Sequence, residues 1–259
     1  MHIIESHNLI INAGNPWAYQ LAVIVAAIIG GAFIRHDSRT WTLSKYSGYW
    51  LLGVAALGSL VGCAIPAYFA GGLVQKIAVT SIVAPKTILG GILFGFIFIV
   101  IYKKVTKNGI DTSDAFARGT ICMMFIGRLG CIAQHCCYGD ITTTFWGMQF
   151  GDGQMRIPVQ YIEASGLFIL TTIIFWLHYK DYMKGRRLFV IFAIYGVMRF
   201  ILEYLRAPIS ESISGIGFYQ WLSLLLALTG VFQTIKRTLN PITINHQTQS
   251  ICAQGKVSI

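Results

Sequence analysis

The chain has 259 residues, of which 55% are hydrophobic and only 12% are charged, and its mean hydropathy is positive. This composition excludes a soluble domain of the same length and predicts an integral membrane protein. The formal net charge of +10 does not indicate a nucleic-acid-binding surface, because most basic residues fall in alternate loops between apolar segments. We therefore expect a phospholipid bilayer, and no nucleic acid, as the partner of this chain.

Seven apolar runs have the roughly 17 to 25 residues that a helix needs to cross about 30 Å of hydrocarbon. They are centred on Ala26, Leu57, Phe96, Met123, Leu170, Tyr195 and Leu225. The sequence thus predicts an all-α integral membrane protein with seven transmembrane helices. We expect residues 1–16 to form an outer N-terminal segment, residues 17–237 the membrane domain and residues 238–259 a flexible cytoplasmic tail. The fourth run is the weakest, since arginines and glycines interrupt it.

Basic residues follow the first, third, fifth and seventh runs, whereas the intervening segments hold few. They are Arg35, Arg39, Lys45, Lys103, Lys104, Lys107, Lys180, Lys184, Arg186, Arg187, Lys236, Arg237 and Lys256. Because cytoplasmic loops carry an excess of Lys and Arg, this pattern predicts an outer N-terminus and a cytoplasmic C-terminus. The polar segment between the fourth and fifth helices is then an irregular outer loop.

Polar residues in the outer half of the membrane are the candidate site. An arginine near the bilayer centre costs roughly 2.5 to 3.5 kcal/mol on insertion scales, so Arg128 needs a partner or a function. The predicted orientation brings Lys86, Gln160 and Glu163 to the same level. Several glycines in these helices, among them Gly90, Gly91 and Gly130, are expected foremost to let helices pack closely. Gly139, in contrast, lies where turns are expected.

The sixth helix carries a polar stripe. Tyr195, Arg199, Glu203 and Arg206 fall within about 80° of one another at roughly 100° per residue. The stripe could be a self-contained ladder that holds the bundle together. Its two arginines outnumber its glutamate, however, and Arg128 adds to the positive surplus, so an anionic lipid head group is the expected counter-charge.

These motifs resemble the prolipoprotein diacylglyceryl transferase family. The resemblance rests on three groups of residues in the family's order and spacing. They are Arg128, Leu129, Gly130 and Gly139; Pro158, Gln160 and Glu163; and Tyr195, Gly196, Arg199, Phe200, Glu203 and Arg206. It covers roughly residues 58–230.

The resemblance implies a transferase in the outer leaflet of a bacterial inner membrane. It would move a diacylglyceryl group from phosphatidylglycerol to the lipobox cysteine thiol of a prolipoprotein, whose signal peptide is then a partner, with no cofactor and no metal. Arg128 and Arg199 would bind the phosphate, while Glu163, Glu203 and Arg206 would hold them in place.

Tyr195 and a set of residues expected to contact the substrate complete the candidate site. Tyr195 could hydrogen-bond the lipid or the thiol. Substrate contacts are expected from Lys86, Gly90, Gly91, Gly130, Gly139 and Gln160.

The chain departs from the family pattern at two places. Leu89 precedes Gly90 and Gly91 where the family has a histidine that could act as base, and its loss would cost on the order of a hundredfold in rate. His135, or Lys86 with a lowered pKa, could replace that base.

The second departure is a group of three cysteines, Cys131, Cys136 and Cys137, within the signature segment. Neighbouring cysteines supply tetrahedral metal geometry poorly, so a disulfide or a packed thiol cluster is at least as good an interpretation. Two other functions stay open from sequence alone. One is a membrane thiol or metal redox protein built on these cysteines, and the other is a non-catalytic protein that binds anionic lipid.

Overall fold

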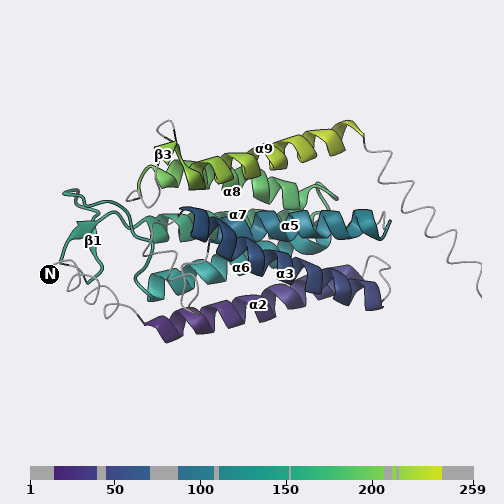
Figure 1. The fold of residues 1–259 in the computed structure, drawn as a ribbon, viewed down its shortest axis with the longest axis horizontal. Coiled ribbons are helices and arrows are strands. Elements are labelled where there is room, and N and C mark those ends of the chain that lie inside the picture. Colours follow the sequence, from purple (N-terminus) through teal and green to yellow (C-terminus); the bar gives the residue numbers. More distant parts are fainter. Residues whose placement is uncertain are drawn as a thin grey trace, which may run out of the picture.

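Seven helices dominate the part of the chain that the computed structural model describes, residues 15–39, 45–70, 87–107, 111–151, 153–206, 212–213 and 216–240. They are α2 (Pro16–Arg39), α3 (Lys45–Ala70), α5 (Ile88–Val105), α6 (Ser113–Ala133), α7 (Val159–Tyr179), α8 (Arg187–Glu203) and α9 (Phe218–Leu239). They form one bundle, elongated along the helix direction (Figure 1). Each helix contains one of the seven predicted centres, so the all-α prediction is confirmed. Lys86, residues 1–14 and residues 241–259 lie outside the described residues.

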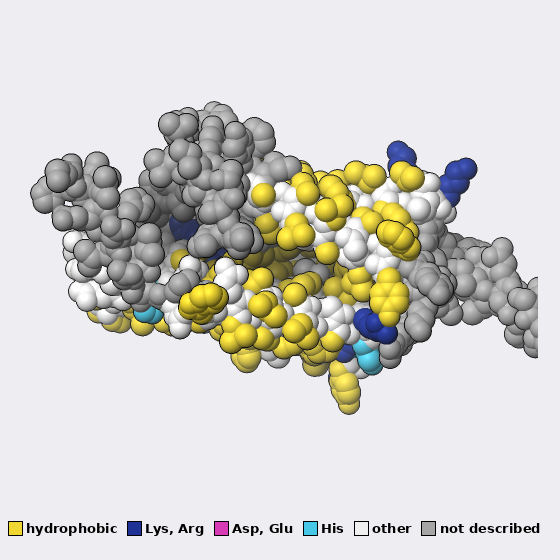
Figure 2. All heavy atoms as spheres, turned by 60° about the horizontal axis from the view of Figure 1, so that its bottom comes forward, with side chains coloured by type: hydrophobic (Ala, Val, Ile, Leu, Met, Phe, Trp, Pro, Cys, Tyr) yellow, Lys and Arg dark blue, Asp and Glu magenta, His cyan; other side chains and the backbone are white. Residues whose placement is uncertain are grey.

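Five of these helices, α2, α5, α6, α7 and α9, are long and apolar enough to cross a membrane. Helix α8 has 17 residues and includes charged side chains, and the apolar part of α3 covers 48–64. Large hydrophobic side chains such as Leu21, Ile28 and Ile169 are exposed on the flanks of the bundle. Figure 2 shows such side chains over much of one face. The chain is therefore a multi-pass membrane protein.

Helix α6 lies at the centre of the bundle and packs against α2, α7 and α8. It is a continuous helix despite the arginines and glycines that weaken its hydropathy. Its contact with α2 requires small residues, because a Cβ on Gly119 would lie 2.5 Å from the carbonyl oxygen of Gly30. Such close backbone approach is the usual basis of helix packing in lipid. Gly119 and Gly30 thus act as packing residues in addition to the glycines for which the sequence predicted that role.

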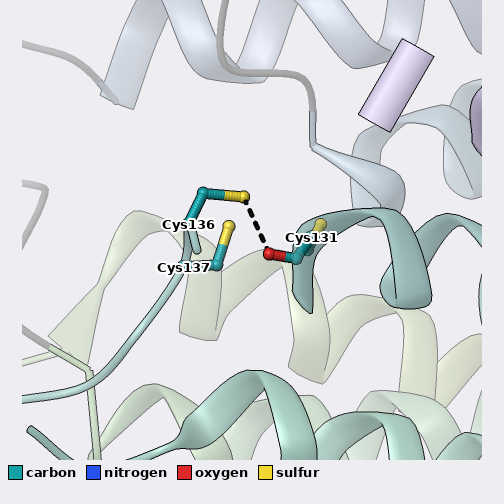
Figure 3. A group of neighbouring side chains, drawn as sticks. All are labelled: Cys131, Cys136 and Cys137. Carbon is teal, nitrogen blue, oxygen red and sulfur yellow. Dashed lines mark hydrogen bonds between the residues drawn. The ribbon is translucent and has the colours of Figure 1, made fainter. Parts of the chain in front are cut away.

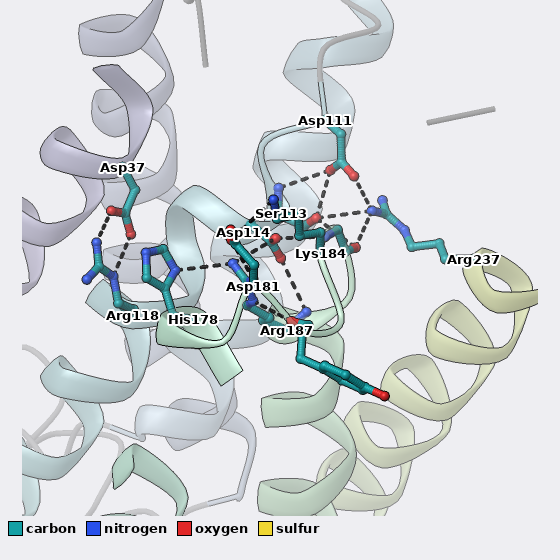
Figure 4. A network of polar contacts seen from close by, with 12 residues as sticks. Asp37, Asp111, Ser113, Asp114, Arg118, His178, Asp181, Lys184, Arg187 and Arg237 are labelled. Carbon is teal, nitrogen blue, oxygen red and sulfur yellow. Dashed lines mark hydrogen bonds and ion pairs between the residues drawn. The ribbon is translucent and has the colours of Figure 1, made fainter. Parts of the chain in front are cut away.

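A network of ion pairs closes one end of the bundle (Figure 4). Arg118 pairs with Asp37, and Arg237 pairs with Asp111. Asp114 accepts hydrogen bonds from the backbone N–H groups of Gly185, at 2.7 Å, and Arg187, at 3.3 Å. The Arg187 guanidinium also lies 3.3 Å from the Asp114 carboxylate. This network therefore joins α6 to the turn that leads into α8.

The segment between α6 and α7 contains a short hairpin that the sequence did not predict. Strands β1 (Met148–Gln149) and β2 (Met155–Arg156) are antiparallel, with Met148 opposite Arg156. A second pair, β3 (Ser212–Ile213) and β4 (Ile216–Gly217), precedes α9. The predicted irregular loop is thus partly ordered by backbone pairing.

The Asp114 network makes a direct prediction about stability. Asp114→Ala leaves the buried guanidinium of Arg187 with only the exposed carboxylate of Asp181, at 3.7 Å, and should lower the free energy of unfolding by about 3 to 5 kcal/mol. Asp181→Ala is the matched control, because the Asp181 side chain is 70% exposed and should change stability by less than about 1 kcal/mol. Thermal unfolding in detergent measures both, and equal effects would contradict this role of Asp114.

Candidate functional site

A buried ion pair links α6 to α7 at the end of the bundle opposite the network. The guanidinium of Arg128 bonds the carboxylate of Glu163, and the Tyr195 hydroxyl of α8 donates to the same carboxylate oxygen at 3.1 Å. The exposed fractions of the three residues are 4%, 0% and 1%. Three helices therefore meet at one buried carboxylate.

A second ion pair extends the site along α8. Arg199 contacts the Glu203 carboxylate at 2.8 Å, and Arg206 approaches the same oxygen at 3.9 Å. Helix α8 ends at Glu203, so Arg206 reaches this position from the turn that follows. Glu163 also interacts electrostatically with Arg128, Arg199 and Arg206. The predicted polar stripe thus lines one site with Arg128.

Several buried polar atoms of this site have no hydrogen-bond partner among the described residues. They are Nε of Arg128, Nη1 of Arg199, Nε of Arg206, Oε2 of Glu163 and both amide atoms of Gln160. The Gln160 side chain is fully buried at the start of α7. Unpaired buried polar groups are costly, so such a cluster is typical of a site that receives a polar ligand.

The charges of the site determine which ligand fits. Three arginines, Arg128, Arg199 and Arg206, face two glutamates, Glu163 and Glu203. The site therefore keeps one unbalanced positive charge in a largely buried environment, where an anion is the natural partner. Arginine forks match the oxygens of a phosphate group in particular.

The end of α6 positions three cysteines beside these arginines. The backbone N–H of His135 bonds the carbonyl of Ile132 at 3.1 Å, and that of Cys136 bonds the carbonyl of Cys131 at 3.2 Å. With His135 in the left-handed region at φ 55°, this pattern is a Schellman motif, which normally has glycine at that position. The motif brings the side chains of Cys131 and Cys136 to the same side of the chain.

The backbone of Cys137 is also left-handed, with φ 65°, and its sulfur lies beside the other two. All three Sγ atoms lie within 4.8 Å of one another (Figure 3). Side-chain hydrogen bonds with Cys131 and Cys136, together with the nearby Arg206 and Arg128, hold the pKa of the Cys137 thiol well below its usual range. The corresponding hydrogen bonds raise the pKa of the Cys136 thiol. The sequence predicted a possible thiol cluster, but its helix-end geometry came only from the structure.

The predicted glycines occupy different environments. Gly130 packs against Ala22 and Tyr19 of α2, Gly91 faces Cys63 of α3, and the carbonyl of Gly90 contacts Gly62. These contacts are between helices.

Gly139 instead forms an antiparallel bridge with Arg206, and a Cβ there would collide with the carbonyl oxygen of Leu205. The bridge, which the sequence did not predict, fixes the loop against the end of α8.

The structure describes two of the three positions at which the sequence raised the question of a base, Leu89 and His135. Leu89, which stands where the family pattern has a histidine, is 1% exposed and belongs to the hydrophobic core. The ring of His135 packs edge-on against Phe150, with centroids 6.1 Å apart. Lys86 lies outside the described residues. Both carboxylates of the site are paired with arginines, so neither is a free base in this arrangement.

The sequence matches the family described as prolipoprotein diacylglyceryl transferase over residues 16–236. Curated proteins named phosphatidylglycerol--prolipoprotein diacylglyceryl transferase are similar to this chain. That of Clostridium tetani is 28% identical over 56% of this chain and 61% of its own length, and transferase 2 of Clostridium perfringens is 26% identical over 56% and 59%. The similarity thus spans less than two thirds of these two relatives. A Streptococcus agalactiae relative is 28% identical over 66% of this chain and 69% of its own length.

The buried pair of Arg128 and Glu163 makes a prediction by double substitution. Arg128→Leu leaves a buried carboxylate without its main partner and should lower the free energy of unfolding by about 3 to 5 kcal/mol. Adding Glu163→Leu removes that charge and should restore part of the loss, the unpaired Tyr195 hydroxyl keeping about 1 to 3 kcal/mol of it. Thermal unfolding of the three chains in detergent measures the coupling, and purely additive losses would contradict it.

Proposed function

Because the chain belongs to the prolipoprotein diacylglyceryl transferase family, we propose that it transfers a diacylglyceryl group from phosphatidylglycerol to the lipobox cysteine thiol of a prolipoprotein. The observation that carries this proposal is the buried site with three arginines and two glutamates, whose unbalanced positive charge suits a phospholipid phosphate. The relatives' shared name supports the same reaction.

In this reaction the phosphate lies between Arg128 and Arg199. Their buried unpaired nitrogens supply the donors, and the amide of Gln160 supplies another polar contact. Glu163 holds Arg128, and Glu203 holds Arg199 with support from Arg206, so the guanidinium groups are oriented before the lipid arrives. Donors that are already oriented toward developing charge stabilise a transition state most strongly. Tyr195 keeps the Glu163 carboxylate in position.

The chemical step replaces one bond at a glycerol carbon. The acceptor sulfur, as thiolate, attacks the carbon that carries the phosphate ester, forming a C–S bond. The C–O bond breaks, and its electron pair leaves with the phosphate oxygen as glycerol phosphate. The leaving group gains negative charge beside Arg128 and Arg199, which lowers the barrier.

All seven helices cross the membrane in the proposed arrangement, with the N-terminus outside and the C-terminus in the cytoplasm of a bacterial inner membrane. The alternation of basic loops supports this orientation. The site and the β1–β2 hairpin then face the outer leaflet, where a prolipoprotein signal peptide is accessible. The Asp114 network lies on the cytoplasmic side.

The proposal is tested in cells depleted of their own prolipoprotein diacylglyceryl transferase, with lipoprotein maturation followed by gel mobility. This chain should restore maturation, and Arg199→Ala should reduce it at least about 100-fold, as for loss of a transition-state donor. Arg186→Ala is the matched control, since this arginine also lies beside α8 but at the opposite end, where it bonds Thr238. Absence of maturation with confirmed membrane expression, or full activity of Arg199→Ala, would overturn the proposal.

The orientation is tested separately with introduced cysteines. Phe145→Cys, at a fully exposed position beside the hairpin, should react with a membrane-impermeant maleimide in intact cells. Tyr182→Cys, exposed beside the Asp114 network, should react only after permeabilisation. The unmodified chain gives the background of its native cysteines. The reverse pattern would contradict an outer site.

A further inference from the structure

Three cysteine sulfurs lie beside the arginines of the proposed phosphate site. Cys131 and Cys137 both interact electrostatically with Arg128, and Cys137 also with Arg206, so the sulfurs border the anion site directly. Cys131 is buried, whereas Cys136 and Cys137 are half-buried. The group is therefore held inside the protein and keeps some exposure.

The geometry of the cluster suits a thiophilic metal ion. Zinc binds thiolates at about 2.3 Å, so three tetrahedral sulfur ligands lie roughly 3.8 Å apart. The sulfurs already lie within 4.8 Å of one another, and closing to a metal needs shifts of about 1 Å or less. Within the described residues, the group that could hold a metal consists of these three cysteines. Three protein ligands and one open position are typical of catalytic zinc.

The backbone conformation brings the three cysteine side chains together although Cys136 and Cys137 are adjacent in the sequence. The left-handed conformations of His135 and Cys137 turn the chain twice within three residues. Non-glycine residues in this region are strained by roughly 1 to 3 kcal/mol each and persist where the surrounding structure demands it. A disulfide would use two of the three sulfurs, whereas a metal ion engages all of them.

Among the described residues, neither carboxylate of the site is free to take the proton of the acceptor thiol. Leu89 is apolar, His135 packs against Phe150, and the carboxylates of Glu163 and Glu203 are paired with arginines. A thiol that coordinates a metal ion loses its proton outright. A metal on the cysteines would therefore supply the thiolate without a general base.

We propose that Cys131, Cys136 and Cys137 bind one Zn²⁺ ion and that its fourth position takes the sulfur of the acceptor cysteine. This inference rests on the proposed transferase function. The acceptor thiol releases its proton to water as it binds zinc. Its sulfur then forms the C–S bond to the glycerol carbon, the C–O electron pair leaves with glycerol phosphate, and the neutral thioether dissociates from the metal.

The test measures metal content and transfer separately on the full chain purified in detergent. Elemental analysis after dialysis against a weak chelator should find one zinc per chain. Cobalt(II) substitution should give thiolate-to-metal charge-transfer absorption. Serine at any one of the three cysteines should weaken zinc binding by more than the roughly 10- to 100-fold that loss of an outer partner costs. Cys122→Ser, at a buried cysteine elsewhere on α6, is the matched control and should keep the zinc.

Transfer to a lipobox peptide is then assayed on the same samples. A strong chelator should abolish transfer, and added Zn²⁺ should restore it. Zinc bound by the three cysteines with no transfer under any condition would sink the proposed function and leave the metal site standing. Transfer by a chain that holds no more zinc than its triple serine variant, or a disulfide among the three cysteines in the active chain, would overturn the zinc proposal alone.

Discussion

The contact between Arg128 and Glu163 is the constraint on which the rest of the site depends. An arginine buried in a membrane helix is stable only with a partner, and the partner here comes from another helix. Tyr195 fixes the shared carboxylate from a third helix, so α6, α7 and α8 must approach one another at this level. The position of this pair also determines which part of α8 faces it, namely the part that carries the ion pair of Arg199 and Glu203. Close packing of α6 against α2 through small residues holds α6, and with it Arg128, in place.

Two polar regions at opposite ends of α6 have different physical roles. In the Asp114 network, Asp37, Asp111 and Asp114 each pair with an arginine. Such balanced ion pairs fit a role in holding the helices together. The Arg128 site has more arginines than glutamates and several unpaired buried donors. Its excess charge is useful only with an anionic ligand. This difference is a physical reason to assign function to one end and stability to the other.

The sequence was sufficient for the helices and for the charged residues of the site, because both depend on strong local signals. Apolar length predicted each helix, and helical spacing predicted that Arg199 and Glu203 share a face. The pairing of Arg128 with Glu163 could be expected only as a common depth, since their contact depends on helix packing. The sequence predicted a possible cluster of Cys131 with Cys136, but not the Schellman turn that brings them together, because the turn uses His135 where a sequence signal would be glycine. The bridge between Gly139 and Arg206 joins distant segments and has no local signal.

The central claim is that this buried site binds a phospholipid phosphate and transfers the diacylglyceryl group attached to it. The most direct measurement reconstitutes the purified chain in vesicles containing phosphatidylglycerol and adds a lipobox peptide, with mass spectrometry of the peptide and assay of released glycerol phosphate. We predict a thioether-linked diacylglyceryl peptide and an equal amount of glycerol phosphate, with neither product in vesicles of phosphatidylcholine alone. An unmodified peptide in phosphatidylglycerol vesicles, with the chain folded and correctly inserted, would contradict the account.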